Sequence, residues 1–364
     1  MRKKIVLICN ESETVINFRK ELIEFLQTKD YEVYVIVGDA KRKSEIEKLN
    51  VALYVVPFSN RSTNPFSSFK LISSFKRILQ FIKPNSVFTF QIKPNIFGTI
   101  AAHKAGIPFI YSMVEGLGAP FQPNDLKGRV LRKIVCLMYK KAFRPVSKVF
   151  FLNNDDINEF IDRKLISREL SVLIPGIGID CKSYNFNPLV PKEKKVLMLS
   201  RLIVNKGILD YCKIAREIRK NRPDISFYLY GAESQLTVND IIEFINDKSI
   251  IYGGYSTGAS KLYQDCRLYV SCSYREGFPR VILEAMASGC PVIAYNVTGS
   301  NAVIDNNDTG VLLEPKNIDA FCKEIVSLID DEKRLLFFKN KGRLVCEKKY
   351  DSSIVNNIIY KEID

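Results

Sequence analysis

Short apolar runs alternate with segments whose apolar residues recur at helical spacing along most of the 364-residue chain. Strands that are apolar throughout and separated by helices are typical of a parallel sheet covered on both faces. In the first half of the chain this pattern predicts strands at 4–9, 33–38, 53–58, 86–90, 108–113 and 149–152, with helices at 15–28, 42–49, 66–82 and 95–104 and a helix opened by residues 153–156.

A second series of the same kind begins at Lys194, and 364 residues with 46% apolar content are enough for two cores. We therefore predict a first domain at 1–175, a linker at 176–192 and a second domain at 193–350. Gly176 and Gly178 form a G-x-G, but no third glycine and no helix follow, so it is not a dinucleotide fingerprint. The second series predicts strands at 195–200, 226–231, 268–271 and 292–296, and final helices at 318–330, 332–349 and 352–363.

The loops that follow the strands of the first series carry candidate chemistry, because ligands of parallel sheets bind at the carboxyl ends of strands. Arg19 lies just beyond the first such loop and is either a ligand for a substrate phosphate or an ordinary exposed residue at a helix start. Glu115 follows strand 108–113, and Gly116 and Gly118 let the backbone approach a ligand closely. Glu115 either positions or deprotonates a substrate hydroxyl, or is a solvated residue of a turn. The single histidine, His103, is interpreted as a helix residue rather than a catalyst.

The most informative stretch of the second series is Ser273–Pro291. Strand 268–271 leads into a loop ending at 276–278, and a helix opens at Pro279 in its first position and ends near Gly289. Glu276 lies eight residues before Glu284, so two carboxylates flank a helix N-terminus. Amides there favour phosphate, and carboxylates accept hydrogen bonds from ribose and sugar hydroxyls. Taken alone, the spacing is also compatible with a charged loop and a surface ion pair between Arg280 and Glu284.

The sequence EGFPRVILEAMASGCPVIA is similar to the E-x7-E signature of retaining glycosyltransferases of family 4. The resemblance implies a GT-B fold of class α/β, with two Rossmann-like parallel-sheet domains facing a central cleft. It implies that the first domain binds the acceptor, that the second binds a nucleotide sugar, and that the helix at 351–364 returns to the first domain. It further implies that Glu276 contacts donor-sugar hydroxyls and that Glu284 contacts the nucleotide ribose.

The loop at 200–207 resembles the G-R-L-x-x-x-K-G loop of the same family, with Ser200 in place of the first glycine. Both of its cations follow a strand and precede a helix, where they can converge on a diphosphate. The resemblance implies that Arg201 and Lys206 stabilise the departing diphosphate in place of a metal. With Glu276 and Glu115 they make the expected catalytic set. The expected donor-binding set is Gly277, Phe278, Pro279, Arg280, Glu284, Tyr255 and Gly231, and the expected acceptor-binding set is Gly116, Gly118 and Arg19.

Charge is concentrated in the first half of the chain. Of the net charge of +14, residues 1–175 carry 28 Lys and Arg against 16 Asp and Glu. Nucleic acid, an anionic membrane or a diphosphate-bearing substrate would each suit that charge. Residues 127–148 contain eight basic residues and no acidic one, with Val130, Leu131, Ile134, Val135, Met138 and Ala142 at helical spacing. This segment is either a packed helix with a solvated basic side or a helix lying on an anionic inner leaflet.

Three further features limit the class of protein. Nine cysteines without a C-x-x-C indicate reduced thiols of a cytosolic protein, and one histidine excludes a His-rich metal centre. The chain has no apolar window long enough to span a membrane.

The loop at 115–118 resembles the family branch that acts on polyprenyl-diphosphate-linked sugars in bacterial polysaccharide assembly. We therefore expect a retaining, metal-independent glycosyltransferase that moves a hexose or N-acetylhexosamine from a UDP-sugar to such an acceptor. It would need no cofactor, bind no nucleic acid and be peripheral on the inner face of the cytoplasmic membrane, where O-antigen and lipopolysaccharide are assembled. Two alternatives stay open: a GT-B sugar-nucleotide epimerase, which would consume UDP-sugar without an acceptor, and a basic nucleic-acid-binding protein.

Overall fold

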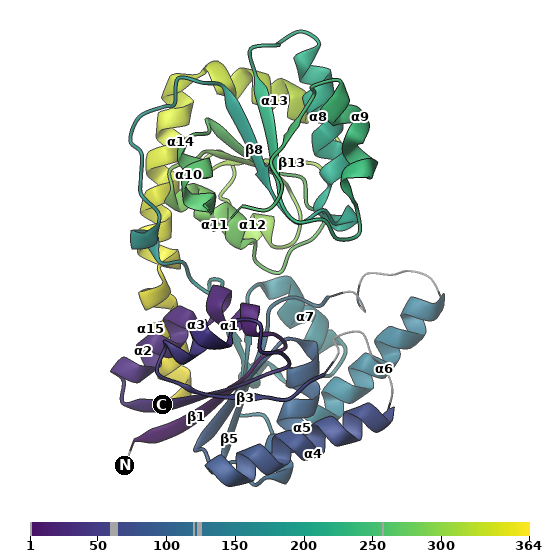
Figure 1. The fold of residues 1–364 in the computed structure, drawn as a ribbon, viewed down its shortest axis with the longest axis vertical. Helices are drawn as coiled ribbons and strands as arrows, with labels where there is room; N and C mark the ends of the chain where they lie inside the picture. Colours follow the sequence, from purple (N-terminus) through teal and green to yellow (C-terminus); the bar gives the residue numbers. More distant parts are fainter. Residues whose placement is uncertain (1, 59–64, 119–120, 122–125, 257) are drawn as a thin grey trace. The chain divides into compact units, whose positions relative to one another are not determined.

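The computed structural model describes residues 2–58, 65–118, 121, 126–256 and 258–364. The chain forms two compact units, the first made of Met1–Ile177 and Ser352–Asp364 and the second of Gly178–Asp351. The chain therefore leaves the first unit once and returns to it with its last helix (Figure 1).

Unit 1 is built around a seven-stranded parallel sheet in the order β3-β2-β1-β4-β5-β6-β7. The strands are β1 Lys3–Ile8, β2 Tyr31–Val37, β3 Ala52–Val55, β4 Ser86–Phe90, β5 Phe109–Val114, β6 Lys148–Phe151 and β7 Ser171–Leu173. The helices are α1 Ser12–Phe18, α2 Lys20–Thr28, α3 Lys43–Glu47, α4 Pro65–Ile82, α5 Thr99–Lys104, α6 Leu126–Ala142, α7 Asn154–Asp162 and α15 Ser352–Ile363.

One core of unit 1 lies under α4, α5 and α6, whose buried residues pack with those of the central strands (Figure 1). The last helix, α15, packs against α2, where the rings of Phe25 and Tyr360 meet edge to face at 6.2 Å. Tyr111 donates its hydroxyl hydrogen to the carbonyl of Ile363, and Lys3 Nζ lies 2.6 Å from Asp364 Oδ1. The C-terminal helix is thus an integral part of unit 1.

Unit 2 has a six-stranded parallel sheet in the order β10-β9-β8-β11-β12-β13. Its strands are β8 Lys195–Leu199, β9 Ser226–Tyr230, β10 Ile251–Tyr252, β11 Leu268–Ser271, β12 Val292–Tyr295 and β13 Val311–Leu313. Its helices are α8 Ile208–Arg219, α9 Ile242–Asn246, α10 Ala259–Gln264, α11 Arg280–Ala287, α12 Ser300–Val303, α13 Ile318–Asp330 and α14 Glu332–Val345.

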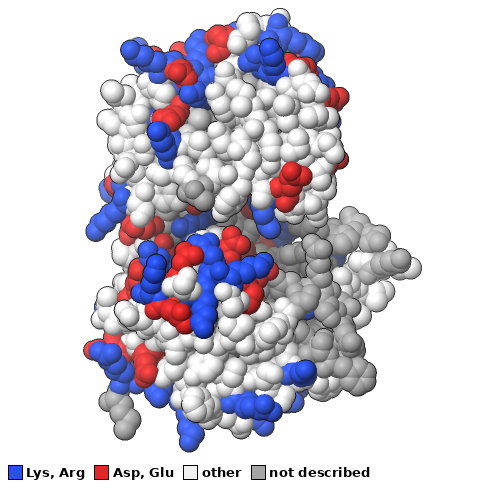
Figure 2. Space-filling model, in the orientation of Figure 1, with Lys and Arg blue, Asp and Glu red and all other residues white. Residues whose placement is uncertain are grey.

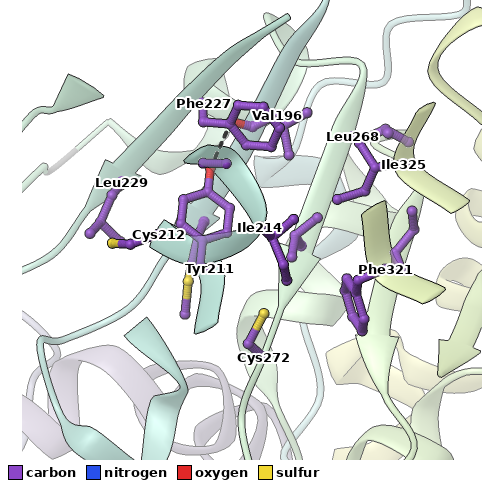
Figure 3. Packing of buried hydrophobic residues seen from close by; sticks show 14 of the residues in the cluster. Val196, Tyr211, Cys212, Ile214, Phe227, Leu229, Leu268, Cys272, Phe321 and Ile325 are labelled. Carbon is purple, nitrogen blue, oxygen red and sulfur yellow. Dashed lines mark hydrogen bonds between the residues drawn. The ribbon is translucent and has the colours of Figure 1, made fainter. Parts of the chain in front are cut away.

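The core of unit 2 between α8, α13 and the sheet is shown in Figure 3. Tyr211 of α8 is fully buried there, and its hydroxyl lies 3.0 Å from the carbonyl oxygen of Val196. Burial of the ring raises the pKa of Tyr211 well above its ordinary value. The polar end of this side chain is satisfied by the sheet backbone, so the helix is fixed against β8.

The predicted parallel α/β architecture is confirmed in both units, and three local predictions are corrected. The expected helix 15–28 is two helices that break at Arg19, which has φ −126° and ψ −8°. The expected helix 95–104 opens with a π-helical turn at Pro94–Gly98. The expected helix 332–349 ends in a second π-helical turn at Cys346–Tyr350.

The segment expected as a linker, 176–192, belongs to unit 2 from Gly178 onward. Ile179 and Cys181 are buried in the cluster that surrounds α11, and Ile179 N donates to the carbonyl of Tyr350 at 2.9 Å. A Cβ on Gly289 would lie 2.6 Å from the ring of Phe186, so this ring covers the end of α11. The segment therefore extends the second core.

On the face drawn in Figure 2, basic and acidic side chains are interspersed over α2 and α3 of unit 1. Ion pairs account for this mixture, among them those of Arg42 with Glu45 and of Lys43 with Glu47. Among the described helices, none combines the length and the apolar character that crossing a membrane requires.

Candidate active site

In unit 2 the expected donor-site residues gather where the strand order reverses, between β8 and β11. The loops that follow these two strands touch directly. Gly207 has φ +69°, and a Cβ at this position would lie 2.0 Å from the carbonyl oxygen of Cys272. Only glycine permits this contact, which brings the loop at 200–207 against the loop at 272–279.

Lys206 and Glu276 form the centre of this cluster. Lys206 Nζ donates to Glu276 Oε1 at 2.5 Å, and their side chains are 25% and 13% exposed. The backbone of Glu276 is held from a third loop, because its amide donates to the carbonyl of Thr298 at 3.0 Å. Gly299, with φ +94°, packs so closely that a Cβ would lie 2.6 Å from the Glu276 carbonyl oxygen. Three loops thus fix one carboxylate beside one ammonium group.

Glu284 lies one turn into α11 and is surrounded by hydrogen-bond donors. Arg280 Nε donates to Oε1 and the Tyr263 hydroxyl donates to Oε2, each at 3.2 Å. Tyr184 also hydrogen-bonds this carboxylate. Burial raises the pKa of Glu284, while the charge of Arg280 and these hydrogen bonds act in the opposite direction. Tyr184 and Tyr263 were not predicted, and their positions in the sequence carry no signal for this contact.

The carboxylates of Glu276 and Glu284 both lie near the buried ring of Tyr269. Burial raises the pKa of Tyr269 well above its ordinary value, and the negative charges of Glu276 and Glu284 act in the same direction. The spacing of eight residues therefore brings both acceptors to the same end of β11, as the sequence suggested.

The start of α11 differs from the prediction by one residue. Pro279 is the N-cap, with φ −76° and ψ 99°, and the helix begins at Arg280. Gly277 takes part in an interaction within the chain, and Phe278 meets the ring of Tyr350 edge to face at 5.6 Å. These two residues are therefore tied into the fold of unit 2.

Of the remaining residues expected to bind the donor, Arg201 and Gly231 lie at or against the loop at 200–207. Arg201 is exposed, and its side chain has no hydrogen-bond or ion-pair partner within the described part of the chain. Gly231 has φ +154° and packs against the carbonyl of Ser200, where a Cβ would lie 1.8 Å from the oxygen. Its amide donates to the carbonyl of Gly254 at 2.8 Å, which ties it to the turn before Tyr255. The Tyr255 side chain is 67% exposed.

In unit 1 a second cluster lies at the corresponding reversal, between β1 and β4. Arg19 is 1% exposed, and its guanidinium forms an ion pair with Glu115 and lies 4.1 Å from the centre of the Phe90 ring. The alternative of an ordinary exposed Arg19 is therefore wrong, because the guanidinium is buried and already paired with Glu115. The contact of Arg19 with an acceptor phosphate stays a prediction. Gln91 Nε2 donates to the other oxygen of Glu115 at 2.9 Å.

The loop after Glu115 has the backbone that glycine favours, with φ +143° at Gly116 and +69° at Gly118. His103 lies exposed on α5, as expected of a helix residue. Within the described residues, no group of three or more His, Cys, Asp or Glu side chains is arranged to hold a metal ion.

Of the basic segment expected at 127–148, residues up to Ala142 lie in α6 and Lys148 begins β6, and the side chain of Lys127 lies outside the described residues. Its apolar residues do not share one face. Val135 and Ala142 are buried, whereas Val130, Ile134 and Leu137 are 52%, 49% and 68% exposed. The helix therefore packs on unit 1 along one side and presents an apolar strip along another.

Comparison with known families assigns both parts of the chain. Residues 4–153 match the family described as glycosyl transferase 4-like, and residues 182–345 match the glycosyl transferases group 1. The resemblance drawn from the E-x7-E stretch is thus confirmed, and the matches favour the transferase over the epimerase and nucleic-acid-binding alternatives.

Two relatives match over nearly their whole length. The N,N'-diacetylbacillosaminyl-diphospho-undecaprenol alpha-1,3-N-acetylgalactosaminyltransferase of Campylobacter jejuni is 27% identical, over 97% of this chain and 96% of that protein. The UDP-Gal:alpha-D-GlcNAc-diphosphoundecaprenol alpha-1,3-galactosyltransferase of Escherichia coli is 26% identical, over 94% and 89%.

Solved structures agree on the fold. The crystal structure of Anabaena HepE in complex with UDP and glucose has a TM-score of 0.82 at 19% identity and covers 99% of both chains. A glycosyltransferase from Rickettsia africae has a TM-score of 0.81 at 20% identity, over 100% of this chain and 98% of that one. Residues 182–345 are therefore identified as a group 1 glycosyltransferase domain and residues 4–153 as a glycosyl transferase 4-like domain, and the chain has the GT-B fold.

Proposed function

We propose that this glycosyltransferase moves a hexose or N-acetylhexosamine from a UDP-sugar to a polyprenyl-diphosphate-linked glycan in the assembly of a bacterial surface polysaccharide. The names of the Campylobacter and Escherichia relatives support a lipid-diphosphate acceptor, and the second names a UDP-sugar donor. The observation that carries the donor half of the proposal is the contact between Lys206 and Glu276. This contact supports the proposal, in which the Lys206 ammonium group would bind phosphate and the neighbouring carboxylate of Glu276 would accept hydrogen bonds from sugar hydroxyls.

Transfer breaks the bond between the anomeric carbon and the UDP oxygen, and negative charge builds on the diphosphate as it leaves. Lys206 and Arg201 would stabilise that charge, since both lie on the loop after β8. Glu276 would accept hydrogen bonds from the donor sugar, and Glu284 from the ribose hydroxyls. The leaving phosphate would take the proton of the acceptor hydroxyl on the same face, so the anomeric configuration would be retained.

Metal independence is part of the proposal. The positive charge that the departing diphosphate needs would come from two side chains of the protein, each able to form charge-assisted hydrogen bonds with phosphate oxygens. No cofactor is required, because the UDP-sugar supplies both the activated carbon and the leaving group.

The acceptor would be met at the membrane surface. Val130, Ile134 and Leu137 form an exposed strip along α6, which we call the α6 strip, and Lys133 and Lys140 are exposed beside it. Apolar residues next to cations suit an interface with anionic lipid, where each basic residue contributes about 1 kcal/mol. We propose that the enzyme binds the inner face of the cytoplasmic membrane peripherally through this strip.

Replacing Glu276 with Gln should reduce transfer by about 100-fold, because a hydrogen bond to a charged acceptor contributes about 1.5 to 3 kcal/mol. The affinity for UDP should change little. Transfer would be assayed with UDP-Gal, UDP-GalNAc, UDP-Glc and UDP-GlcNAc on GlcNAc-diphosphoundecaprenol, and UDP binding by calorimetry. Glu217→Gln, at an exposed position on α8, is the matched control. Normal turnover in a folded Glu276→Gln variant would refute the donor-site assignment.

Replacing Arg201 or Lys206 with Met should weaken UDP binding by about 10- to 100-fold, because each change removes a charge-assisted hydrogen bond to the diphosphate. Uridine, which lacks phosphate, should bind wild type and variants equally. Calorimetric titration of both ligands measures the difference, with the exposed Lys220→Met as control. Equal losses for uridine and UDP would show that these cations do not bind the diphosphate.

Chelation by EDTA should leave the transfer rate unchanged, since the side chains of Arg201 and Lys206 take the place of a metal ion at the leaving group. The measurement is the initial rate before and after chelation, followed by addition of Mg²⁺ or Mn²⁺. A rate that collapses in EDTA and recovers with either ion would contradict the proposal of metal independence.

Replacing Leu137 with Asp should reduce binding to vesicles that contain phosphatidylglycerol, because the change places a negative charge in the α6 strip. Binding of the wild type should also weaken at high salt, which screens the exposed lysines. Flotation of vesicles measures both effects, and Leu336→Asp, at an exposed position in unit 2, is the control. If vesicle binding depends neither on lipid charge nor on the Leu137→Asp change, the α6 strip is not the membrane-binding surface.

A further inference from the structure

The ion pair between Arg19 and Glu115 lies mostly inside unit 1. The Arg19 side chain is 1% exposed, and its guanidinium lies over the Phe90 ring on one side. A buried cation needs a compensating anion, and Glu115 supplies it. The glutamate is not buried to the same degree, because 21% of its side chain is exposed. Arg19 therefore approaches Glu115 from inside the unit, while the carboxylate keeps a face toward solvent.

Gln91 completes the arrangement from the adjacent strand. Its Nε2 donates to Glu115 Oε2 at 2.9 Å, and its Oε1 accepts the Asn10 amide hydrogen at 3.1 Å. Gln91 has φ +65°, a left-handed conformation that is uncommon for residues other than glycine. Such conformations persist only where the surroundings fix them, and they concentrate at functional sites. This residue thus links the end of β1 to the carboxylate that follows β5.

Each oxygen of Glu115 receives one hydrogen bond from within the protein, Oε1 from Arg19 and Oε2 from Gln91. These two donors fix the plane of the carboxylate. A carboxylate oxygen can accept more than one hydrogen bond, so both retain capacity on the exposed side. An ionised carboxylate accepts and does not donate, so its partner there must be a donor such as a sugar hydroxyl.

We infer that Arg19 and Gln91 are positioning residues that hold Glu115 in one orientation, and that Glu115 accepts a hydrogen bond from a hydroxyl of the acceptor sugar. This inference rests on the proposed function, in which unit 1 binds the acceptor. It gives Arg19 a role through Glu115 instead of the phosphate contact expected from the sequence. The site lies at the reversal of the strand order in unit 1, the position where parallel sheets bind their ligands.

A double-mutant cycle tests the coupling. Glu115→Gln and Arg19→Met should each lower kcat/KM for GlcNAc-diphosphoundecaprenol at least tenfold, mainly by raising KM, while calorimetric UDP binding stays unchanged. Arg19→Met in the Glu115→Gln background should cause no further loss, because Arg19 acts through Glu115. Arg19→Lys should recover part of the activity. Lys20→Met, at the exposed neighbouring position, is the control.

Gln91→Asn provides a second route if Arg19→Met does not fold. Asparagine tolerates the left-handed backbone but is too short to reach both Asn10 and Glu115. Gln91→Asn should raise KM for the acceptor, and it should cause no further rise in KM in the Glu115→Gln background. Thermal unfolding of each variant separates loss of folding from loss of acceptor binding.

The outcomes are distinguishable. Losses that multiply in the double variants, or an unchanged KM for the acceptor, would overturn the inference and leave a purely structural ion pair. A wild-type enzyme that binds UDP but transfers none of the four sugars to either GlcNAc-diphosphoundecaprenol or the diacetylbacillosamine-linked equivalent would overturn the proposed function itself.

Discussion

The reversal of strand order in each parallel sheet is the constraint on which the chemistry of this protein depends. Where two adjacent strands send their chains to opposite sides, the loops at their carboxyl ends separate and leave backbone and side chains accessible. In unit 1 this occurs between β1 and β4, and in unit 2 between β8 and β11. The Arg19, Gln91 and Glu115 cluster lies at the first reversal and the Lys206 and Glu276 pair at the second. The same topology therefore builds both candidate sites from residues that are distant in sequence.

Close backbone contacts convert this general position into a defined geometry. Gly207 and Gly299 both lie where a Cβ would collide with a neighbouring carbonyl group. Gly207 brings the loop that carries Lys206 against the loop that leads to Glu276, and Gly299 brings a third loop against Glu276 itself. Both glycines also have positive φ, which any other residue would adopt only under strain. The ion pair between Lys206 and Glu276 is thus a consequence of backbone packing, and its geometry does not depend on the flexible lysine side chain alone.

Sequence reasoning succeeded where the information is local. The E-x7-E stretch joins one strand end to the first turn of the next helix, so spacing alone places Glu276 and Glu284 at the same end of β11. The apolar runs predicted the parallel strands correctly because this pattern is also local in the sequence. The pairing of Arg19 with Glu115 joins residues 96 positions apart, and an arginine after a loop carries no sign that it is buried. The break between α1 and α2 and the contact of Tyr184 with Glu284 likewise depend on tertiary packing.

The Arg19–Glu115 pair and the Lys206–Glu276 pair differ in how a ligand could bind beside them. Arg19 is buried, so separating it from Glu115 would leave an uncompensated charge inside the protein, which is strongly unfavourable. A ligand must therefore bind to the pair as it stands, through the exposed side of the carboxylate. Lys206 is 25% exposed, and its ammonium group has three donors, of which Glu276 occupies one. A phosphate can be added beside Glu276 without separating the pair, with the lysine between two anions. Charges 4 Å apart near a protein surface interact by about 4 kcal/mol, so in the proposed donor complex this ammonium group would offset the repulsion between the carboxylate and the diphosphate.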